Sequence, residues 1–273
     1  MKKFKYIAAP LEDISDSVFR TLCYKYGADL TFTEMARLEG LARKNASTWS
    51  RLCCHDNTPV VVQLLGSKED RLNHFLGMFE PSPGFKGINL NMGCPNPKVI
   101  RIGQGCALVK RLNKARSLVR IIRDYGYPVS IKMRLGLNSF EKKKKIYLAL
   151  IKSVNADFFV VHARHGLEGY DSPADYSVFP ECVATGKQII ANGDIDSKEK
   201  VESLRTMGVA GVMIGRAAVK NPAIFNELKG LSAPNPKAIR EEYILKSKEL
   251  NHPYRYQKQV LKHLGNESEW QWG

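Results

Sequence analysis

The chain has 273 residues, 44% of them hydrophobic, which is enough for one large domain or for a domain with a small appendage. It carries 42 Lys and Arg against 27 Asp and Glu, and the net charge of +15 favours a polyanionic partner such as RNA or DNA. No window approaches the run of about 18 apolar residues that a membrane-spanning helix needs, so the sequence excludes that class of protein.

The six cysteines stand at positions 23, 53, 54, 94, 106 and 182, without a Cys-x-x-Cys pair and without His at zinc-finger spacing. We therefore expect no metal. The apolar run near the N-terminus is interrupted by Glu12 and Asp13, which makes it too short for a secretory signal. We expect a soluble protein of a reduced, cytoplasmic compartment, and no protein partner is evident.

Eight short apolar runs predict strands, and the segments between them predict helices because their apolar residues recur at three- and four-residue spacing. The strands are expected at 6–9, 30–33, 60–65, 87–91, 129–133, 158–162, 188–191 and 211–214. The helices are expected at 17–26, 68–79, 107–125, 140–154, 197–207 and 217–228, with weaker candidates at 37–51 and 174–184.

Eight β-then-α units within residues 1–230 predict a (β/α)8 TIM barrel, because the strands lack the strict alternation of a half-exposed sheet. A doubly wound sheet is the alternative. Residues 231–273 predict a short α-helical C-terminal extension, with helices at 236–250 and 254–264. Two helices cannot enclose a core of their own, so they should pack on the barrel or on a partner.

A TIM barrel builds its active site at the C-terminal ends of its strands. In this chain polar or ionisable side chains follow the apolar runs at nearly every such end: Glu34, Gln63, Asn91, Lys132, His162, Asn192 and Arg216. We therefore predict that this face of the barrel is the active site.

The stretch 86–110 carries the strongest chemical signal. A short strand ends at Asn91 and breaks on Gly93-Cys94-Pro95. The Asn91 amide can both donate and accept, and Cys94 is the only group there that can move a proton near neutral pH. Because a free thiol has a pKa near 8.5, Cys94 is mostly protonated and suits a general acid. The alternative is a tight turn with a buried thiol.

The last two strand ends, Asn192-Gly193-Asp194 and Gly215-Arg216, lie where barrels commonly hold a phosphate, so a phosphorylated ligand or cofactor fits. Lys132 is expected to point into the barrel mouth, where it could stabilise negative charge on a ring such as a reduced flavin. His162 could hydrogen-bond the same ring or a phosphate. The alternatives are a lysine satisfied near the rim and a core histidine.

These motifs, in this order, resemble those of the tRNA-dihydrouridine synthases, FMN-dependent barrel enzymes that reduce a uridine in tRNA with NADPH. The resemblance covers roughly residues 5–228. The matching motifs are Ala9-Pro10, Thr33-Glu34-Met35, Gln63-Leu64, Asn89-Leu90-Asn91-Met92-Gly93-Cys94-Pro95, Lys132-Met133-Arg134, His162-Ala163-Arg164, Gly169-Tyr170, Asn192-Gly193-Asp194-Ile195 and Met213-Ile214-Gly215-Arg216-Ala217.

The resemblance implies that Cys94 protonates C5 of the uracil while the flavin delivers hydride to C6, and that Asn91 holds the uracil edge. It implies a set of FMN-binding residues: Pro10, Leu11, Gln63, Lys132, His162, Asn192, Gly193, Asp194, Gly215 and Arg216. It implies further substrate contacts from Arg134, Arg164 and Tyr170 to a nucleotide taken out of its stack. The positive barrel would grip tRNA phosphates, and residues 231–273 would be a shortened RNA-binding region.

The chain departs from the family pattern at Leu11 and Asp13, where a methionine and a glycine are usual, and in its short C-terminal region. Two other functions stay open. One is a flavin oxidoreductase of a free pyrimidine, similar to the dihydroorotate dehydrogenases. The other is a non-catalytic RNA-binding relative.

Overall fold

The computed structural model describes residues 3–252 and 254–266, so the last seven residues of the predicted region 231–273 lie outside the described residues. All eight predicted strands are present, and they run parallel. They are β1 (Lys5–Ala8), β2 (Thr31–Phe32), β4 (Val60–Leu65), β5 (Phe85–Met92), β6 (Val129–Arg134), β7 (Phe159–His162), β8 (Ile189–Asn192) and β9 (Gly211–Ile214).

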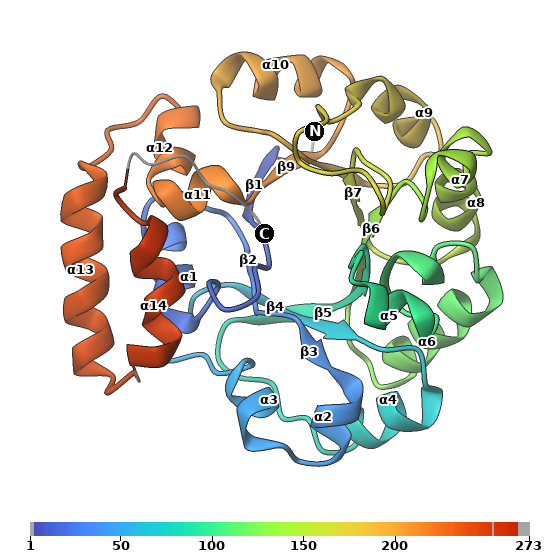
Figure 1. Ribbon diagram of the computed structural model, residues 1–273, viewed down its shortest axis with the longest axis horizontal. Coiled ribbons are helices and arrows are strands. Elements are labelled where there is room, and N and C mark those ends of the chain that lie inside the picture. The colour runs from blue at the N-terminus through green and yellow to red at the C-terminus, as the bar shows by residue number, and fades with distance from the viewer. Residues whose placement is uncertain (1–2, 253, 267–273) are drawn as a thin grey trace.

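The strands follow one another in the order β1-β9-β8-β7-β6-β5-β4-β2. The two ends of this order meet through a parallel bridge between Ile7 and Leu30, where the Ala8 N–H donates to the Leu30 carbonyl at 3.0 Å. The sheet therefore closes into a ring with helices around it (Figure 1), which confirms the TIM-barrel prediction. One short strand, β3 (Ala36–Arg37), was not predicted and pairs with β4 beyond β2.

The predicted helical segments are helical, and several of them form in two pieces. The α-helices are α1 (Ser17–Lys25), α2 (Leu38–Ala42), α3 (Ala46–Ser50), α4 (Glu69–Leu76), α5 (Pro97–Arg101), α6 (Leu112–Asp124), α7 (Ser139–Lys143), α8 (Ile146–Ser153), α9 (Phe179–Val183), α10 (Lys198–Thr206), α11 (Arg216–Lys220), α12 (Ile224–Leu228), α13 (Pro236–Glu249) and α14 (Tyr254–His263). Two 3-10 turns, Gly105–Leu108 and Tyr176–Val178, precede α6 and α9. The segment 140–154 breaks at Lys145, whose φ of 51° is left-handed and cannot continue a right-handed helix.

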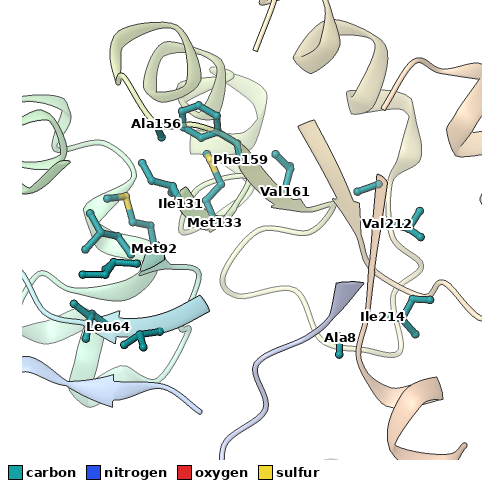
Figure 2. Close-up of a cluster of buried hydrophobic side chains, with 14 of the residues drawn as sticks. Ala8, Leu64, Met92, Ile131, Met133, Ala156, Phe159, Val161, Val212 and Ile214 are labelled. Atoms are coloured by element: carbon teal, nitrogen blue, oxygen red, sulfur yellow. The ribbon is translucent and has the colours of Figure 1, made fainter. Parts of the chain in front are cut away.

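Two apolar clusters sandwich the strands, because successive side chains of a strand point to opposite faces. Outward side chains such as Leu64, Ile131 and Phe159 pack against the helices in one large cluster (Figure 2). A second cluster fills part of the barrel interior: Ile7, Ala9, Phe32, Val61, Val160, Ile190 and Met213. Burial on both faces explains why the sequence shows little alternation along these strands.

The interior is polar on β5 and β6 and at the C-terminal end of β4. Gln63 of β4 lies in register with Asn89 of β5, and Asn89 lies in register with Ser130 of β6. One layer higher, Asn91 lies in register with Lys132. The fold therefore gathers amide, hydroxyl and ammonium groups from three adjacent strands on one side of the barrel.

The C-terminal helices belong to the same core as the barrel. Helices α13 and α14 pack beside α1 and α11 (Figure 1), and Ile239 and Val260 join the outer apolar cluster. The Tyr243 hydroxyl donates to Oδ2 of Asp16 at 2.6 Å, and Oδ1 of the same carboxylate caps α1 by accepting from the Phe19 N–H at 2.8 Å. One buried carboxylate thus ties the extension to the barrel.

We predict that Tyr243→Phe lowers the free energy of unfolding by about 1.5–3 kcal/mol, because a buried charged acceptor loses one donor. Urea unfolding followed by circular dichroism measures the change. The matched control is Tyr24→Phe, whose ring is 45% exposed, and it should stay within about 0.5 kcal/mol of the unmodified protein. Equal effects of the two substitutions would contradict the proposed role of the Asp16 contact.

Candidate active site

The turn that carries Cys94 is held by the side chain of Asn91. The Asn91 Oδ1 accepts hydrogen bonds from the backbone N–H groups of Gly93 at 3.0 Å and Cys94 at 2.9 Å. Its Nδ2 donates to Oε1 of Gln63 at 2.9 Å and lies 3.3 Å from the Met35 sulfur. The side-chain oxygen of Asn91 is therefore fully used by the turn. The Nδ2 hydrogen that faces the weakly accepting Met35 sulfur is the one that Asn91 could donate to a ligand.

Cys94 is partly buried and stays a thiol at neutral pH. Burial raises its pKa above the ordinary value, which opposes ionisation and favours a proton donor over a nucleophile. Its carbonyl accepts from the Cys106 N–H at 3.0 Å, and the Cys106 thiol donates to the Gly93 carbonyl at 3.1 Å. A Cβ at Gly105 would lie 2.4 Å from the Cys94 carbonyl oxygen, so only glycine allows this close approach.

Lys132 brings an uncompensated positive charge to the same side of the barrel. It lies in register with Asn91 on the neighbouring strand. Burial, reinforced by the charge of Arg134, lowers its pKa to about 8. Among the described residues its ammonium takes part in no hydrogen bond or ion pair. A shielded cation without a partner is costly to hold, so this position suits a ligand that carries or develops negative charge.

After β7 and β8, the buried Arg164 forms an ion pair with the partly exposed Asp194. Arg164 has no exposed surface, and it donates to both oxygens of Asp194, at 3.0 and 2.5 Å, and to the Ser172 carbonyl at 2.8 Å. Arg216 donates to the same carboxylate at 2.5 Å. Burial alone would raise the pKa of Asp194, but the hydrogen bonds from Arg164 and the Ala174 N–H outweigh it and lower the pKa.

Two residues with predicted site roles meet at this ion pair. Arg164 is expected to meet a nucleotide. Its guanidinium is enclosed and donates to the Ser172 carbonyl and to Asp194, and the nucleotide contact stays a prediction. Asp194 is expected to help hold a phosphate. Its carboxylate orients Arg216 at the cleft, and its part in phosphate binding stays a prediction.

His162 is a neutral hydrogen-bonding group. Burial and the nearby positive charges, that of Lys132 first, place its pKa well below the ordinary value. Its Nε2 lies 3.2 Å from Nη1 of Arg164. A guanidinium can only donate, so Nε2 accepts and the ring proton is assigned to Nδ1. In register His162 lies between Arg134 and Asn192 and so connects the two sides of the barrel mouth.

Tyr170 presents a half-exposed ring above these groups. The ring is 41% exposed, and its centroid lies 4.4 Å from the Arg216 guanidinium, 5.5 Å from that of Arg164 and 5.8 Å from that of Arg134. Arg134 itself is buried and donates to two carbonyls of the 165–168 loop, at 2.8 and 3.1 Å. Arg134 thus supports the loop, and Tyr170 is the side chain that faces outward.

A cleft of about 720 Å³ opens at the ends of β8 and β9, a size typical of ligand sites. It is lined by Tyr170, Asp171, Pro173, Asn192, Gly193, Asp194, Ile195, Asp196, Lys200, Met213, Gly215, Arg216, Ala217 and Lys220. Arg216, Lys200 and Lys220 are its cations. Gly193 has a φ of 122°, and a Cβ there would lie 2.9 Å from the Ala174 Cβ, so this turn requires glycine.

The structure brings the predicted site residues together in two groups. The cleft contains Tyr170, Asn192, Gly193, Asp194, Gly215 and Arg216. Gln63, Asn91, Cys94 and Lys132 lie on or directly after β4, β5 and β6. Pro10 and Leu11 follow β1, and Leu11 reaches the cleft edge, since its Cδ2 would lie 3.8 Å from a Cβ placed at Gly215.

Sequence reasoning missed two buried polar residues, Asn89 and Ser130. Asn89 precedes Asn91 by two residues, and Ser130 precedes Lys132 by two. Because side chains of a strand repeat with period two, each shares a face with a predicted site residue, and that spacing was the available signal.

Within the described residues no group of three or more His, Cys, Asp or Glu is arranged to hold a metal ion. Over the same residues, none of the helices combines the length and the apolar character needed to cross a membrane.

The chain is similar to proteins named as tRNA-dihydrouridine synthases. The family model for dihydrouridine synthase (Dus) matches residues 7–270. A probable tRNA-dihydrouridine synthase of Helicobacter pylori is 34% identical over 259 residues, which are 89% of this chain and 75% of that protein. The probable tRNA-dihydrouridine synthase 2 of Bacillus subtilis is 32% identical over 234 residues, 81% of this chain and 71% of that protein.

Two further relatives differ more in length or sequence. The tRNA-dihydrouridine(47) synthase (NAD(P)(+))-like protein of Rattus norvegicus is 30% identical over 229 residues, and the match spans 82% of this chain but 36% of that protein. Among solved structures, morphinone reductase has a TM-score of 0.54 at 12% identity, covering 85% of this chain and 87% of its own. That likeness shows the fold alone.

We predict that Lys132→Met stabilises the ligand-free protein at pH 7 by on the order of 2 kcal/mol, because it removes a shielded charge. The folded-state pKa of about 8 lies below the unfolded value of about 10.4, so between these values the folded state binds fewer protons and its stability rises with pH. The advantage of the variant should therefore shrink from pH 8 to pH 10, which urea unfolding at several pH values measures.

The control for this prediction is Lys152→Met, which removes an exposed lysine from α8. It should give neither the gain at pH 7 nor its decline with pH. A Lys132→Met variant that is no more stable at pH 7, or equally favoured at pH 10, would contradict the role assigned to burial.

Proposed function

Because the chain belongs to the dihydrouridine synthase family, we propose that it reduces the C5=C6 bond of a uridine in tRNA, with FMN as the bound hydride carrier and NADPH as the reductant. The observation that carries the proposal is the pairing of Cys94 and Lys132. A protonated thiol and an unpartnered ammonium stand at the ends of two adjacent strands, β5 and β6. A reduction of this kind needs a proton donor and a stabiliser of negative charge.

The residues of the barrel mouth fit a phosphorylated flavin. The cleft offers Arg216 and Lys220 for a phosphate, and Gly193 and Gly215 keep it open. Bound FMN would supply the hydride that C6 receives. Lys132 would stabilise negative charge on the ring. The proposed contacts with the cofactor come from Pro10, Leu11, Gln63, Lys132, His162, Asn192, Gly193, Asp194, Gly215 and Arg216.

Cys94 would donate its proton to C5 of the uracil and recover one from water. Its raised pKa keeps the proton in place until the carbon accepts it. Asn91 would donate the Nδ2 hydrogen that faces the Met35 sulfur to a carbonyl of the base. The half-exposed Tyr170 ring would stack on the nucleotide, because an aromatic face accepts any flipped base.

Charge supports a tRNA substrate. Of the net charge of +15, +13 lies in residues 1–230, so the positive field belongs to the barrel that carries the site. Such a field attracts the phosphates of an RNA. We propose that residues 231–273 contribute to RNA binding beside the barrel, and that the protein acts in the cytoplasm.

The direct test incubates the FMN-loaded protein with unmodified tRNA and NADPH. Nucleoside mass spectrometry should find a uridine that gains two hydrogens. Turnover of free pyrimidines without stimulation by RNA would favour the oxidoreductase alternative. Binding of tRNA by a protein that never takes up FMN would favour the non-catalytic one.

We predict that Cys94→Ala slows uridine reduction by about 100- to 10,000-fold, the usual contribution of a general acid. FMN content and the rate of flavin reduction by NADPH should stay near normal, because the thiol serves only the proton transfer. The control is Cys53→Ala, which removes an exposed thiol and should leave all three measurements unchanged. Undiminished uridine reduction by Cys94→Ala would remove the proposed acid.

A further inference from the structure

A continuous chain of side-chain hydrogen bonds joins three adjacent strands on one side of the barrel interior and ends at the Cys94 turn. The Asn89 Nδ2 donates to Oγ of Ser130 at 2.9 Å, and the Gln63 Nε2 donates to Oδ1 of Asn89 at 2.8 Å. The Asn91 Nδ2 then donates to Oε1 of Gln63 at 2.9 Å. Three amides from two strands are thereby joined in one line to the backbone of residues 93 and 94.

The direction of every bond in this chain is forced from the Cys94 end. The two backbone N–H groups of the turn can only donate, so the carbonyl of Asn91 must face them. Its NH2 group must then face Gln63, whose own NH2 group must face Asn89. Reversal of any single amide would set two donors against each other. Only the Ser130 hydroxyl can both donate and accept, so it is a suitable end for the chain.

The middle of the chain is sealed from water. Gln63 is 1% exposed, Asn89 0% and Ser130 2%. Water cannot replace a lost partner at such positions, so removal of one member leaves a buried group unsatisfied. We therefore expect loss of the Ser130 hydroxyl to shift the Asn89 amide, and with it the amides of Gln63 and Asn91.

We propose that Asn89 and Ser130 are positioning residues for Cys94: they fix the amides of Gln63 and Asn91, and through Asn91 the turn that presents the thiol. Neither bonds to the turn directly. Their effect on catalysis rests on the proposed function, whereas their effect on the geometry of the turn does not.

The first experiment measures the turn itself and needs no activity. In the purified protein, iodoacetamide labelling of Cys94 is followed by peptide mass spectrometry, with the exposed Cys53 as an internal reference. In Asn89→Leu and Ser130→Ala the ratio of Cys94 to Cys53 labelling should rise by about fivefold, because loss of a buried bond makes opening of the turn more frequent. Ser130→Thr retains the hydroxyl and should restore the ratio.

The matched control is Thr31→Val. Thr31 is equally buried in the barrel, and its hydroxyl donates to the Pro59 carbonyl at 2.8 Å, outside the chain of amides. Its labelling ratio should equal that of the unmodified protein. An unchanged ratio in both Asn89→Leu and Ser130→Ala, or an equal rise in Thr31→Val, overturns the proposal. Ser130→Ala keeps the test decisive if Asn89→Leu does not fold.

The second experiment measures catalysis. Asn89→Leu should lower kcat for uridine reduction by about 10- to 100-fold with little change in KM for tRNA, as expected for a misplaced reacting group. In a Cys94→Ala background the same substitution should cost nothing further, because there is no thiol left to position. An equal loss in both backgrounds overturns the positioning role. If the unmodified protein reduces no tRNA, the proposed function fails, and the labelling ratios still decide this inference.

Discussion

The site depends on one constraint, the burial of polar side chains inside a closed barrel. Strands β4, β5 and β6 point amides, a hydroxyl and an ammonium into a space whose remainder is filled by apolar side chains. Gln63 and Asn89 can be buried, and Asn91 partly buried, because the three amides satisfy one another. The same bonds fix the turn after β5. On this side of the barrel, the hydrogen bonds that satisfy the buried polar core also set the geometry of the candidate site.

On the opposite side of the barrel mouth, two arginines are placed close together by a shared carboxylate. Arg164 and Arg216 converge on one carboxylate, that of Asp194, which sits in a left-handed turn with a φ of 52°. The pairing lets Arg164 be fully buried and holds Arg216 at the cleft beneath the Tyr170 ring. Lys132 has no such partner. The two cations therefore differ in their pairing. Arg216 shares the Asp194 carboxylate with Arg164, whereas Lys132 has no carboxylate partner among the described residues.

The sequence predicted the positions of strands and strand ends better than it predicted their partners. Strands β4 and β9 have the predicted bounds, because each is a short apolar run that stops at a glycine, Gly66 and Gly215. The two residues of β3 pair only through a tertiary contact with β4, so no local pattern reveals them. The burial of Arg164 depends on Asp194, which is thirty residues away in the sequence. The hydrogen bond from the Gly93 N–H to the side-chain oxygen of Asn91 depends on the geometry of the turn, which the sequence motif does not specify.

A single physical cause sets the chemistry of the two central groups. Desolvation is the largest influence on both pKa values, and it raises that of the Cys94 thiol while it lowers that of the Lys132 ammonium to about 8. Both groups therefore keep their protons at pH 7, and the Lys132 ammonium, with its pKa of about 8, is the closer of the two to losing one. A neighbouring thiolate would be stabilised by the ammonium, yet burial outweighs that attraction and keeps sulfur neutral. Burial in the barrel therefore makes the Cys94 thiol a proton donor rather than a nucleophile. It also leaves the Lys132 ammonium able to pair with a negatively charged ligand.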